Sequence, residues 1–267
     1  MLTLYVSMKI SVVIPARNEA DNLPRCLASL ARQTRPVDEI IVVDNDSHDD
    51  TALVAAKFPS VTVLSQTTRG RVYARDTGFS AARGDIIARI DADSVVPQGW
   101  AQHIEQFYSD KAHHGFAWTG DAVFTNVPVP RLVSSVYNWM VFKMNKVLTG
   151  HAALWGSNMA LPAGVWRLVA AEVCHTNDIH EDLDLSIHLH RLGVPLYRDT
   201  AVPVGATMRR VLGDRGDLWA YLQMWPETLR RHGIWTWPLC WLVGALGLYC
   251  ASYGLVMVEL FRNKIGR

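Results

Sequence analysis

The sequence has few cysteines, almost no net charge and no repeats. Its four cysteines show no paired metal-binding spacing, so we expect buried or lipid-facing thiols in a reducing compartment. They are Cys26, Cys174, Cys240 and Cys250. The formal net charge of +1 gives no reason to expect a nucleic acid as partner. The sequence has no internal repeat or low-complexity linker, and its 267 residues are enough for one large domain or two small ones.

The N-terminus lacks the pattern of a signal peptide. Residues 1–7 are apolar, but the stretch is short, has no basic lead and is soon followed by Lys9. Met8 is an alternative start of the chain.

Strands and helices are predicted to alternate from the N-terminus to Ile90. Apolar runs predict strands over 10–15, 39–43, 61–64 and 86–90, and helical patterns predict helices over 23–30, 52–58 and 69–82. Such alternation is typical of a parallel sheet of the nucleotide-binding type. The fold class predicted from this half of the chain is therefore α/β.

Acidic side chains follow the strand predicted over 86–90. Asp91 and Asp93 lie two residues apart, and turn-forming residues come directly after them. Ligands of an open α/β sheet bind outside the carboxyl ends of its strands, where two carboxylates are suited to hold a divalent cation. The segment Pro15–Glu19 and Asp44 also follow strands and should line the same edge. The alternative is that the two acids merely cap a turn or the next helix.

Taken in order, these segments resemble the family 2 glycosyltransferases, which have the GT-A fold. The matching segments are Val13–Glu19, Ile41–Ser47 with Asp49 and Thr51, Gly70–Gly84 and Asp91–Asp93. The resemblance extends over roughly residues 8–212. The family usually has Asp-Asp-Gly-Ser in the second segment, where this chain has Asp44-Asn45-Asp46-Ser47.

The resemblance implies a nucleotide-sugar donor and a Mg²⁺ or Mn²⁺ cofactor. It implies that Asp44 pairs with the base, that Asp93 binds the metal directly, and that Asp91 reaches the ribose or the metal through water. The cation would neutralise charge on the departing diphosphate. The other residues implied on the donor side are Pro15, Ala16, Arg17, Glu19, Arg71, Arg75 and Ala92. For Arg75 the alternative is a place on the solvated face of its helix.

A second acidic segment begins a predicted helix. Glu181, Asp182 and Asp184 lie in its first turn, where acids could simply compensate the helix dipole. Their distance from Asp91–Asp93 and the segment Leu189–Gly193 match the family, and this resemblance implies that Asp182 is the general base. A helix N-terminus favours the ionised carboxylate, which is the form that accepts a proton.

The second half of the chain carries the residues implied on the acceptor side. A strand predicted over 116–124 begins this half, and a Gly-x-Asn segment at 156–158 is similar to one that lies by the donor sugar in the family. That segment could also be a plain turn into a strand. The residues implied on the acceptor or diphosphate side are Asn158, Glu181, Arg209 and Arg210. The two arginines could alternatively meet acidic lipid head groups.

Two apolar segments indicate a membrane, in a sequence that is 49% hydrophobic. Pro130–Leu148 is either a core helix or, as we favour, a helix at the membrane boundary. Ile234–Phe261 is nearly free of charge and long enough to exceed the roughly 30 Å hydrocarbon core. Trp235, Trp237 and Trp241 at its start are typical of an interfacial belt. Basic residues on both flanks leave its orientation undecided. Proline and glycine residues within it permit a bend, so both a tilted span and a re-entrant hairpin are possible, and the alternative is a buried helix.

We therefore predict a GT-A-type α/β fold with a mixed, mostly parallel sheet flanked by helices over residues 1–232. The nucleotide-binding half is placed at about 8–110 and the acceptor half at about 111–232, followed by a membrane-associated segment over 233–267. The predicted function is an inverting glycosyltransferase, cytoplasmic in its catalytic domain, with a lipid-linked or membrane-surface acceptor. The alternatives are a nucleotidyltransferase, whose Gly-rich loop is missing here, and a catalytically silent membrane scaffold.

Overall fold

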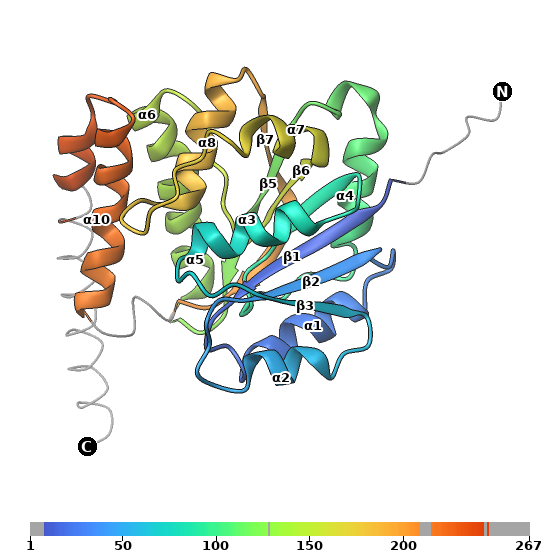
Figure 1. Ribbon diagram of the computed structural model, residues 1–267. Helices are drawn as coiled ribbons and strands as arrows, with labels where there is room; N and C mark the ends of the chain where they lie inside the picture. The colour runs from blue at the N-terminus through green and yellow to red at the C-terminus, as the bar shows by residue number, and fades with distance from the viewer. Residues whose placement is uncertain (1–7, 128, 209–214, 243–244, 246–267) are drawn as a thin grey trace.

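The computed structural model describes residues 8–127, 129–208, 215–242 and 245, and Figure 1 shows its central sheet with helices on both faces. The strands are β1 Ile10–Ala16, β2 Glu39–Asp44, β3 Val61–Ser65, β4 Ile86–Arg89, β5 Ala117–Phe124, β6 Met159–Pro162 and β7 Leu196–Ala206. The α-helices are α1 Leu23–Ala31, α2 Thr51–Ala56, α3 Arg71–Ala81, α4 Trp100–Ser109, α5 Pro130–Asn138, α6 Asn145–Thr149, α7 Ala163–Val169, α8 Glu181–Arg191 and α10 Arg215–Arg231. A 3₁₀ turn, η1 Lys111–His113, and a π-helical segment, η2 Trp139–Met144, lie between them.

The strands form one sheet in the order β3-β2-β1-β4-β6-β5-β7. Neighbours among β1 to β4 are parallel, and β7 is parallel to β5. Strand β6 runs antiparallel to β4 on one side and to β5 on the other. The mixed, mostly parallel sheet predicted from the sequence is therefore confirmed.

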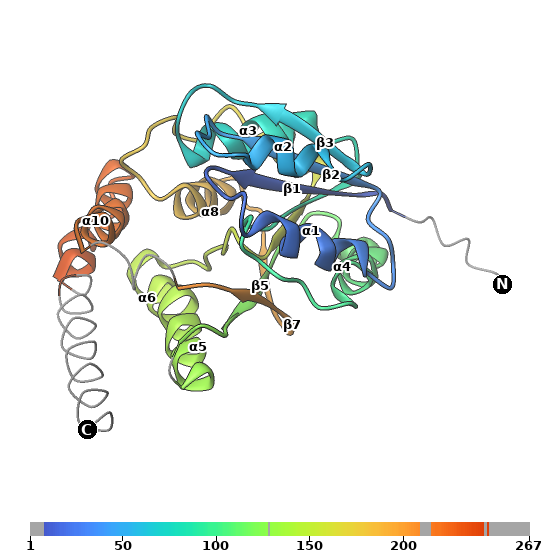
Figure 2. The ribbon, with the colours of Figure 1, turned by 90° about the horizontal axis from the view of Figure 1, so that it is seen from below.

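Alternating side chains of the central strands supply two hydrophobic cores, one on each face. Val12 and Ile14 of β1 pack in the cluster that contains the apolar faces of α1 and α4. Val13 points to the other face and packs with residues of α3, α7 and α8. Figure 2 shows these helix layers from below. Because α8 belongs to the second layer, its first turn is held against the carboxyl end of β4.

Strand β7, with 11 residues, is the longest strand of the described sheet. Its pairing with β5 continues after a register shift, so that Val204 lies beside Ala122 and Ala206 beside Phe124. Asp199 and Pro203 interrupt the apolar alternation, which is why the sequence pattern conceals the second half of the strand.

The helix predicted over Pro130–Leu148 is present as α5, η2 and α6. The Asn138 amide fixes it to the sheet, because its oxygen accepts from Ala122 N–H at 3.0 Å and its nitrogen donates to Ala122 C=O at 2.9 Å. One face packs on the core through Val141 and Phe142. Large apolar side chains remain exposed on the other face: Val129, Leu132, Val136, Trp139 and Val147.

The predicted membrane-associated segment 233–267 lies mostly outside the described residues. Only 233–242 and 245 of it are described, with helical backbone from Trp237. Arg209, Arg210 and residues 1–7 also lie outside the described part. Across the residues that are described, none of the helices has both the length and the apolar character needed to cross a membrane.

Candidate active site

The loops after β1 and β2 lie side by side at the carboxyl edge of the sheet. The two strands end in register, with Ala16 beside Asp44. Glu19 N–H donates to Thr51 Oγ1 at 2.8 Å, which joins the two loops. The donor-side residues predicted in them are Pro15, Ala16, Arg17, Glu19 and Asp44, and the fold brings all five to this edge.

Two residues that depart from the Asp-Asp-Gly-Ser pattern have structural roles in the second loop. Asn45 is buried, and its amide donates to Gln66 C=O at 3.0 Å and Thr68 C=O at 2.7 Å while accepting from Gly70 N–H at 2.8 Å. Asp46 has φ 57°, the left-handed conformation that glycine adopts without strain. The chain thus has a left-handed residue at the position where the family pattern has glycine.

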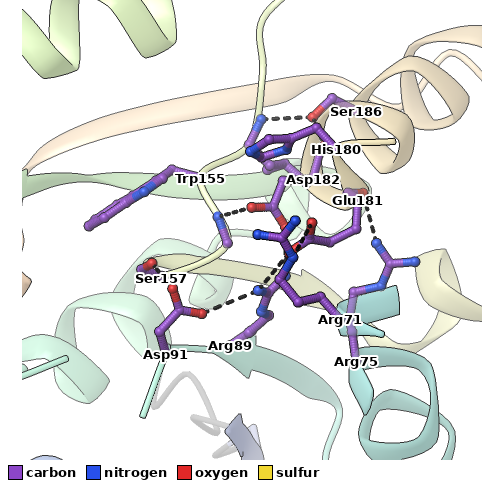
Figure 3. Close-up of polar contacts among 12 residues, drawn as sticks. Arg71, Arg75, Arg89, Asp91, Trp155, Ser157, His180, Glu181, Asp182 and Ser186 are labelled. Atoms are coloured by element: carbon purple, nitrogen blue, oxygen red, sulfur yellow. Dashed lines mark hydrogen bonds and ion pairs between the residues drawn. The ribbon is translucent and has the colours of Figure 1, made fainter. Parts of the chain in front are cut away.

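A buried guanidinium, that of Arg89 at the end of β4, lies among three carboxylates (Figure 3). Its Nη1 donates to Asp182 Oδ1 at 2.6 Å, and its Nη2 donates to Asp91 Oδ1 at 3.2 Å and Glu181 Oε1 at 3.3 Å. Burial by itself would lower the pKa of Arg89, but the three carboxylates raise it above its ordinary value. Arg89 therefore stays charged and joins both acidic segments, which lie far apart in the sequence.

The Asp182 carboxylate is fixed from both sides. One oxygen accepts from Arg89, and Oδ2 accepts from Gly156 N–H at 3.0 Å. Ser186 Oγ donates to Asp182 C=O at 2.6 Å and accepts from Leu154 N–H at 2.8 Å, which ties the first turn of α8 to the 154–156 segment. An ideal Cβ on Gly156 would lie 2.4 Å from Asp182 Oδ2 and 2.6 Å from Arg89 Nη1. This close approach therefore requires glycine.

Glu181 is bound by two arginines of α3. Its Oε2 lies 3.3 Å from Arg71 Nε, and its carbonyl accepts from Arg75 Nη1 at 2.8 Å. Burial would raise the pKa of Glu181, but the charges of Arg71, His180 and Arg89 bring it well below its ordinary value. Arg75 is fully buried, so the alternative that placed it on a solvated helix face is wrong. A donor contact by either arginine stays a prediction.

Asp91 and Asp93 are partly exposed at the end of β4, on either side of the buried Ala92. The Ser157 hydroxyl donates to Asp91, and the Thr207 hydroxyl donates to Asp93. Both hydroxyls come from the predicted acceptor half, so that half helps to hold the two acids. Carboxylate oxygens at an accessible strand end suit the hard cations Mg²⁺ and Mn²⁺.

Asn158 is fully buried beside this site and bonded within the protein. Its Oδ1 accepts from Trp100 Nε1 at 2.9 Å, and its Nδ2 donates to the carbonyls of Asp121 and Val202 at 3.3 and 3.2 Å. These bonds join β5, β7 and α4 to the start of β6. The structure thus gives the side chain a supporting role, and a contact with the donor or diphosphate stays a prediction.

A comparison with known protein families identifies the family of the chain. The family model described as "Glycosyl transferase family 2" matches residues 11–163, which include both loops and both acids of β4. The chain belongs to glycosyl transferase family 2. The resemblance predicted from the sequence is confirmed, and the family favours a glycosyltransferase over the nucleotidyltransferase alternative.

Glycosyltransferases from other organisms match a part of the chain. A 4,4'-diaponeurosporenoate glycosyltransferase from Staphylococcus haemolyticus is 40% identical over 116 residues, which are 41% of this chain and 31% of that protein. Glycosyltransferase AglE from Haloferax volcanii is 35% identical over 100 residues, 35% of this chain and 33% of that protein. The matches thus span about a third of the length of these relatives.

Solved structures share the fold at low sequence identity. S. aureus TarS in complex with UDP-GlcNAc superposes with a TM-score of 0.63 at 19% identity, covering 84% of this chain and 65% of that one. The mannosyltransferase PcManGT from Pyrobaculum calidifontis, in complex with GDP-Man and Mn²⁺, gives 0.62 at 18%, covering 97% and 80%. The GT-A-type fold predicted for this family 2 chain is thereby confirmed.

Arg89 is one of the site residues that sequence reasoning missed. A charged residue inside the otherwise apolar Ile86–Ile90 run is the signal that could have found it, because a buried charge needs partners. Ser157 and Thr207 carried no such signal, since single hydroxyls are common in loops. Their roles follow only from the folding of the acceptor half onto β4.

Proposed function

We propose that this family 2 protein transfers a sugar from a nucleotide-sugar donor to a hydroxyl or phosphate acceptor, with inversion at the anomeric carbon. The observation that carries the proposal is the meeting of Asp91, Glu181 and Asp182 around Arg89. Three carboxylates with one buried cation at the carboxyl edge of a sheet are suited to ligand binding and proton transfer rather than to packing.

Asp182 is the proposed general base. Its carboxylate accepts the acceptor's proton as the acceptor oxygen bonds to the anomeric carbon, and the nucleoside diphosphate leaves from the opposite face. Arg89 and Gly156 N–H orient the carboxylate, and each of its oxygens has a second lone pair for the acceptor. Inversion follows because a single displacement exchanges the two groups on that carbon.

Asp93 is the proposed direct ligand of Mg²⁺ or Mn²⁺, and Asp91 is proposed to reach the ribose or the metal through water. The accessible oxygens of both side chains fit such a cation. When bound, the metal supplies charge neutralisation at the leaving diphosphate. The Mn²⁺ in the PcManGT structure supports this assignment for a protein of the same fold.

Asp44 is proposed to pair with the nucleotide base. Within the described structure its Oδ1 is buried and has no hydrogen-bond partner, which an imide or amide N–H of a base would supply. The neighbouring structures with UDP-GlcNAc and GDP-Man support a nucleoside-diphosphate sugar as the donor class. Pro15–Glu19 and Arg71 complete the proposed donor side.

The acceptor is proposed to be lipid-linked or to lie at a membrane surface, with the catalytic part in the cytoplasm. The exposed apolar face of α5–η2–α6 lies next to the segment of Trp235 and Trp237, because the Thr236 hydroxyl donates to Leu148 C=O. Together they offer one apolar surface to membrane lipid. Free thiols at Cys26 and Cys240 support a reducing compartment.

The test compares Asp182→Asn with the unchanged chain. Asn keeps the size of the side chain but cannot accept the proton, so transfer should fall about 10²- to 10⁴-fold while donor affinity stays nearly unchanged. Calorimetry measures donor binding, and release of nucleoside diphosphate from UDP- and GDP-sugars measures turnover. Asp110→Asn, at the exposed N-cap residue before η1, is the matched control and should change neither.

A second variant separates the metal from the base. Asp93→Asn should weaken donor binding in the presence of Mn²⁺ as well as turnover, because Asp93 would hold the cation that neutralises the charge of the diphosphate. Equal turnover of Asp182→Asn and the unchanged chain would refute the base assignment. A chain that binds no nucleotide sugar and releases no diphosphate would instead favour the silent scaffold.

A further inference from the structure

Four metal-ligating side chains converge beside α8. Cys174 lies in the loop before α8, Asp184 and His188 lie one helical turn apart on α8, and His232 follows α10. One ligand atom from each lies within 4.8 Å of all the others. The cluster does not include Asp91 or Asp93.

The protein by itself leaves this cluster incompletely paired. Asp184 is fully buried, and it accepts from Cys174 N–H at 3.0 Å and lies 2.8 Å from His232 Nε2. His188 Nε2 is buried without a hydrogen-bond partner in the described structure, 3.5 Å from Asp184 Oδ1. An imidazole nitrogen beside a carboxylate and a thiol is placed as a ligand would be, and a cation would satisfy all of them.

We propose that Cys174, Asp184, His188 and His232 bind one Zn²⁺ ion. A mixed set of one sulfur, one oxygen and two imidazole nitrogens is the donor chemistry of zinc, whereas Mg²⁺ and Ca²⁺ take oxygen. Tetrahedral zinc sets its ligand atoms roughly 3.5 Å apart, so side-chain movements of about an ångström close the site. Four protein ligands leave no open position, which defines a structural centre.

Binding requires a defined movement of protons. The Cys174 thiol has a pKa raised to about 11 by burial and by Asp184, and it gives its proton to solvent when the sulfur binds zinc. His232 must carry its proton on Nδ1 to bind through Nε2. The Arg191 guanidinium, which lies 3.0 Å from Nδ1, then has to turn away, and its bond to His232 C=O at 2.8 Å can remain.

Zinc at this place would add a metal bridge between elements that are already joined by hydrogen bonds, such as that from His180 N–H to Thr228 Oγ1 at 2.8 Å. It would join the end of α10 and the loop before α8 to α8 itself, two residues from Asp182. Beside it, Leu183 and Ile187 of α8 pack with Leu229 of α10. The proposed ion therefore stabilises the helix turn that carries the proposed base without touching a reacting atom.

The first test measures zinc in the full chain, purified without chelator and then exposed to Zn²⁺ alone. We expect one zinc per chain by elemental mass spectrometry, retained after excess Mg²⁺, and a lower melting temperature once a strong zinc chelator removes it. Replacement by Co²⁺ should give the visible bands of a tetrahedral site and a sulfur-to-cobalt charge-transfer band. Failure of the full chain to retain zinc or to form these bands would overturn the proposal.

Variants then locate the ion. Cys174→Ser should lose the charge-transfer band, and His188→Gln should lose zinc, with circular dichroism to verify folding. His190→Gln on the exposed side of α8 and Cys240→Ser are the matched controls and should keep the full metal content. Asp93→Asn should also keep it, because the proposed active-site metal is a different ion. Zinc retained in Cys174→Ser/His188→Gln would place it elsewhere and overturn the proposal.

Discussion

The Arg89 guanidinium is a buried positive charge that binds three carboxylates of the active site. Removing a charge from water is costly, and the three carboxylates offset this cost by direct hydrogen bonds. A buried ion network of this kind is weak evidence for stability. Its more specific effect is positional, since Asp91 and Asp182 are both oriented by the same planar group.

A substitution at Gly156 would test how closely the position of the Asp182 carboxylate is fixed. Gly156→Ala would set a Cβ 2.4 Å from Asp182 Oδ2, so the carboxylate has to move. A displacement near 1 Å at a reacting group can lower the rate about 10²-fold, and we expect turnover to fall by this factor. Turnover and donor binding are measured side by side, and donor binding should change much less.

The control for this substitution is Gly164→Ala on the exposed side of α7. A Cβ there has a single neighbour within 4 Å, the end of the Arg167 side chain at 3.8 Å. Alanine also favours the helix, so turnover should not change and stability should rise slightly. Equal turnover of both alanine variants would show that the Gly156 contact does not position Asp182.

The lowered pKa of Glu181 predicts that the stability of the folded chain depends on pH. Its pKa is lower in the folded chain than its ordinary value of 4.5, so the folded state keeps it ionised after the unfolded chain has taken up a proton. Its stabilisation is therefore complete above about pH 5 and is lost as the pH falls. Glu181→Gln should reduce the free energy of unfolding by about 2–3 kcal/mol at pH 7 and flatten the decline toward pH 3.

Urea unfolding at several pH values gives these free energies. Glu172→Gln, at an exposed site after α7, should follow the curve of the unchanged chain. A Glu181→Gln curve that runs parallel to the unchanged one at all pH values would show that this carboxylate does not cause the acid dependence.

At the scale of elements, the sequence predicts the first half of the fold closely because each strand there is a short apolar run. Strand β4 and the acids after it are an example, because the apolar run predicts a buried strand and the turn-forming residues after it predict where that strand ends. The second half is harder. The end of β7 depends on its pairing with β5, and the meeting of α8 with β4 depends on the long-range contact of Arg89 with Asp182. The hydrophobic periodicity of the sequence indicates neither of these two contacts.

The loop after β2 gives a prediction at this scale. Asn45→Ala removes three hydrogen bonds that join this loop to the one before α3. We expect a loss of about 1–3 kcal/mol in the free energy of unfolding, because the freed groups are partly buried. Donor affinity should fall as well, since the neighbouring Asp44 loses its support. Thermal melting and donor calorimetry measure the two effects.

Asn177→Ala is the matched control for the loop. Asn177 holds the same segment through one exposed bond, to Arg69 C=O at 2.8 Å. Its loss should cost well under 1 kcal/mol and leave donor affinity nearly unchanged. If Asn45→Ala behaves like this control, the buried amide does not organise the donor side.

At the scale of the whole molecule, several exposed apolar side chains lie on α5–η2–α6 and on the segment after α10. Figures 1 and 2 show α6 near the described segment that follows α10, and Leu148 of α6 packs with Leu229 of α10. Trp139 is 58% exposed and Trp235 is 84% exposed. Such side chains are costly on a surface in water and typical of one that meets lipid. This distribution supports the proposed membrane attachment within the described part of the chain.

The membrane prediction separates this surface from the C-terminal residues that follow it. A chain ending at residue 242 should still bind phosphatidylcholine–phosphatidylglycerol vesicles. The double substitution Trp139→Ser/Trp235→Ser in that chain should weaken binding at least about tenfold, because the two indole rings are no longer available for burial in lipid. Leu53→Ser/Leu168→Ser removes equally exposed apolar side chains from α2 and α7 and should bind unchanged. Vesicle sedimentation measures all three. If only the full chain sediments, attachment resides in 243–267 and the surface of α5–η2–α6 does not bind the membrane.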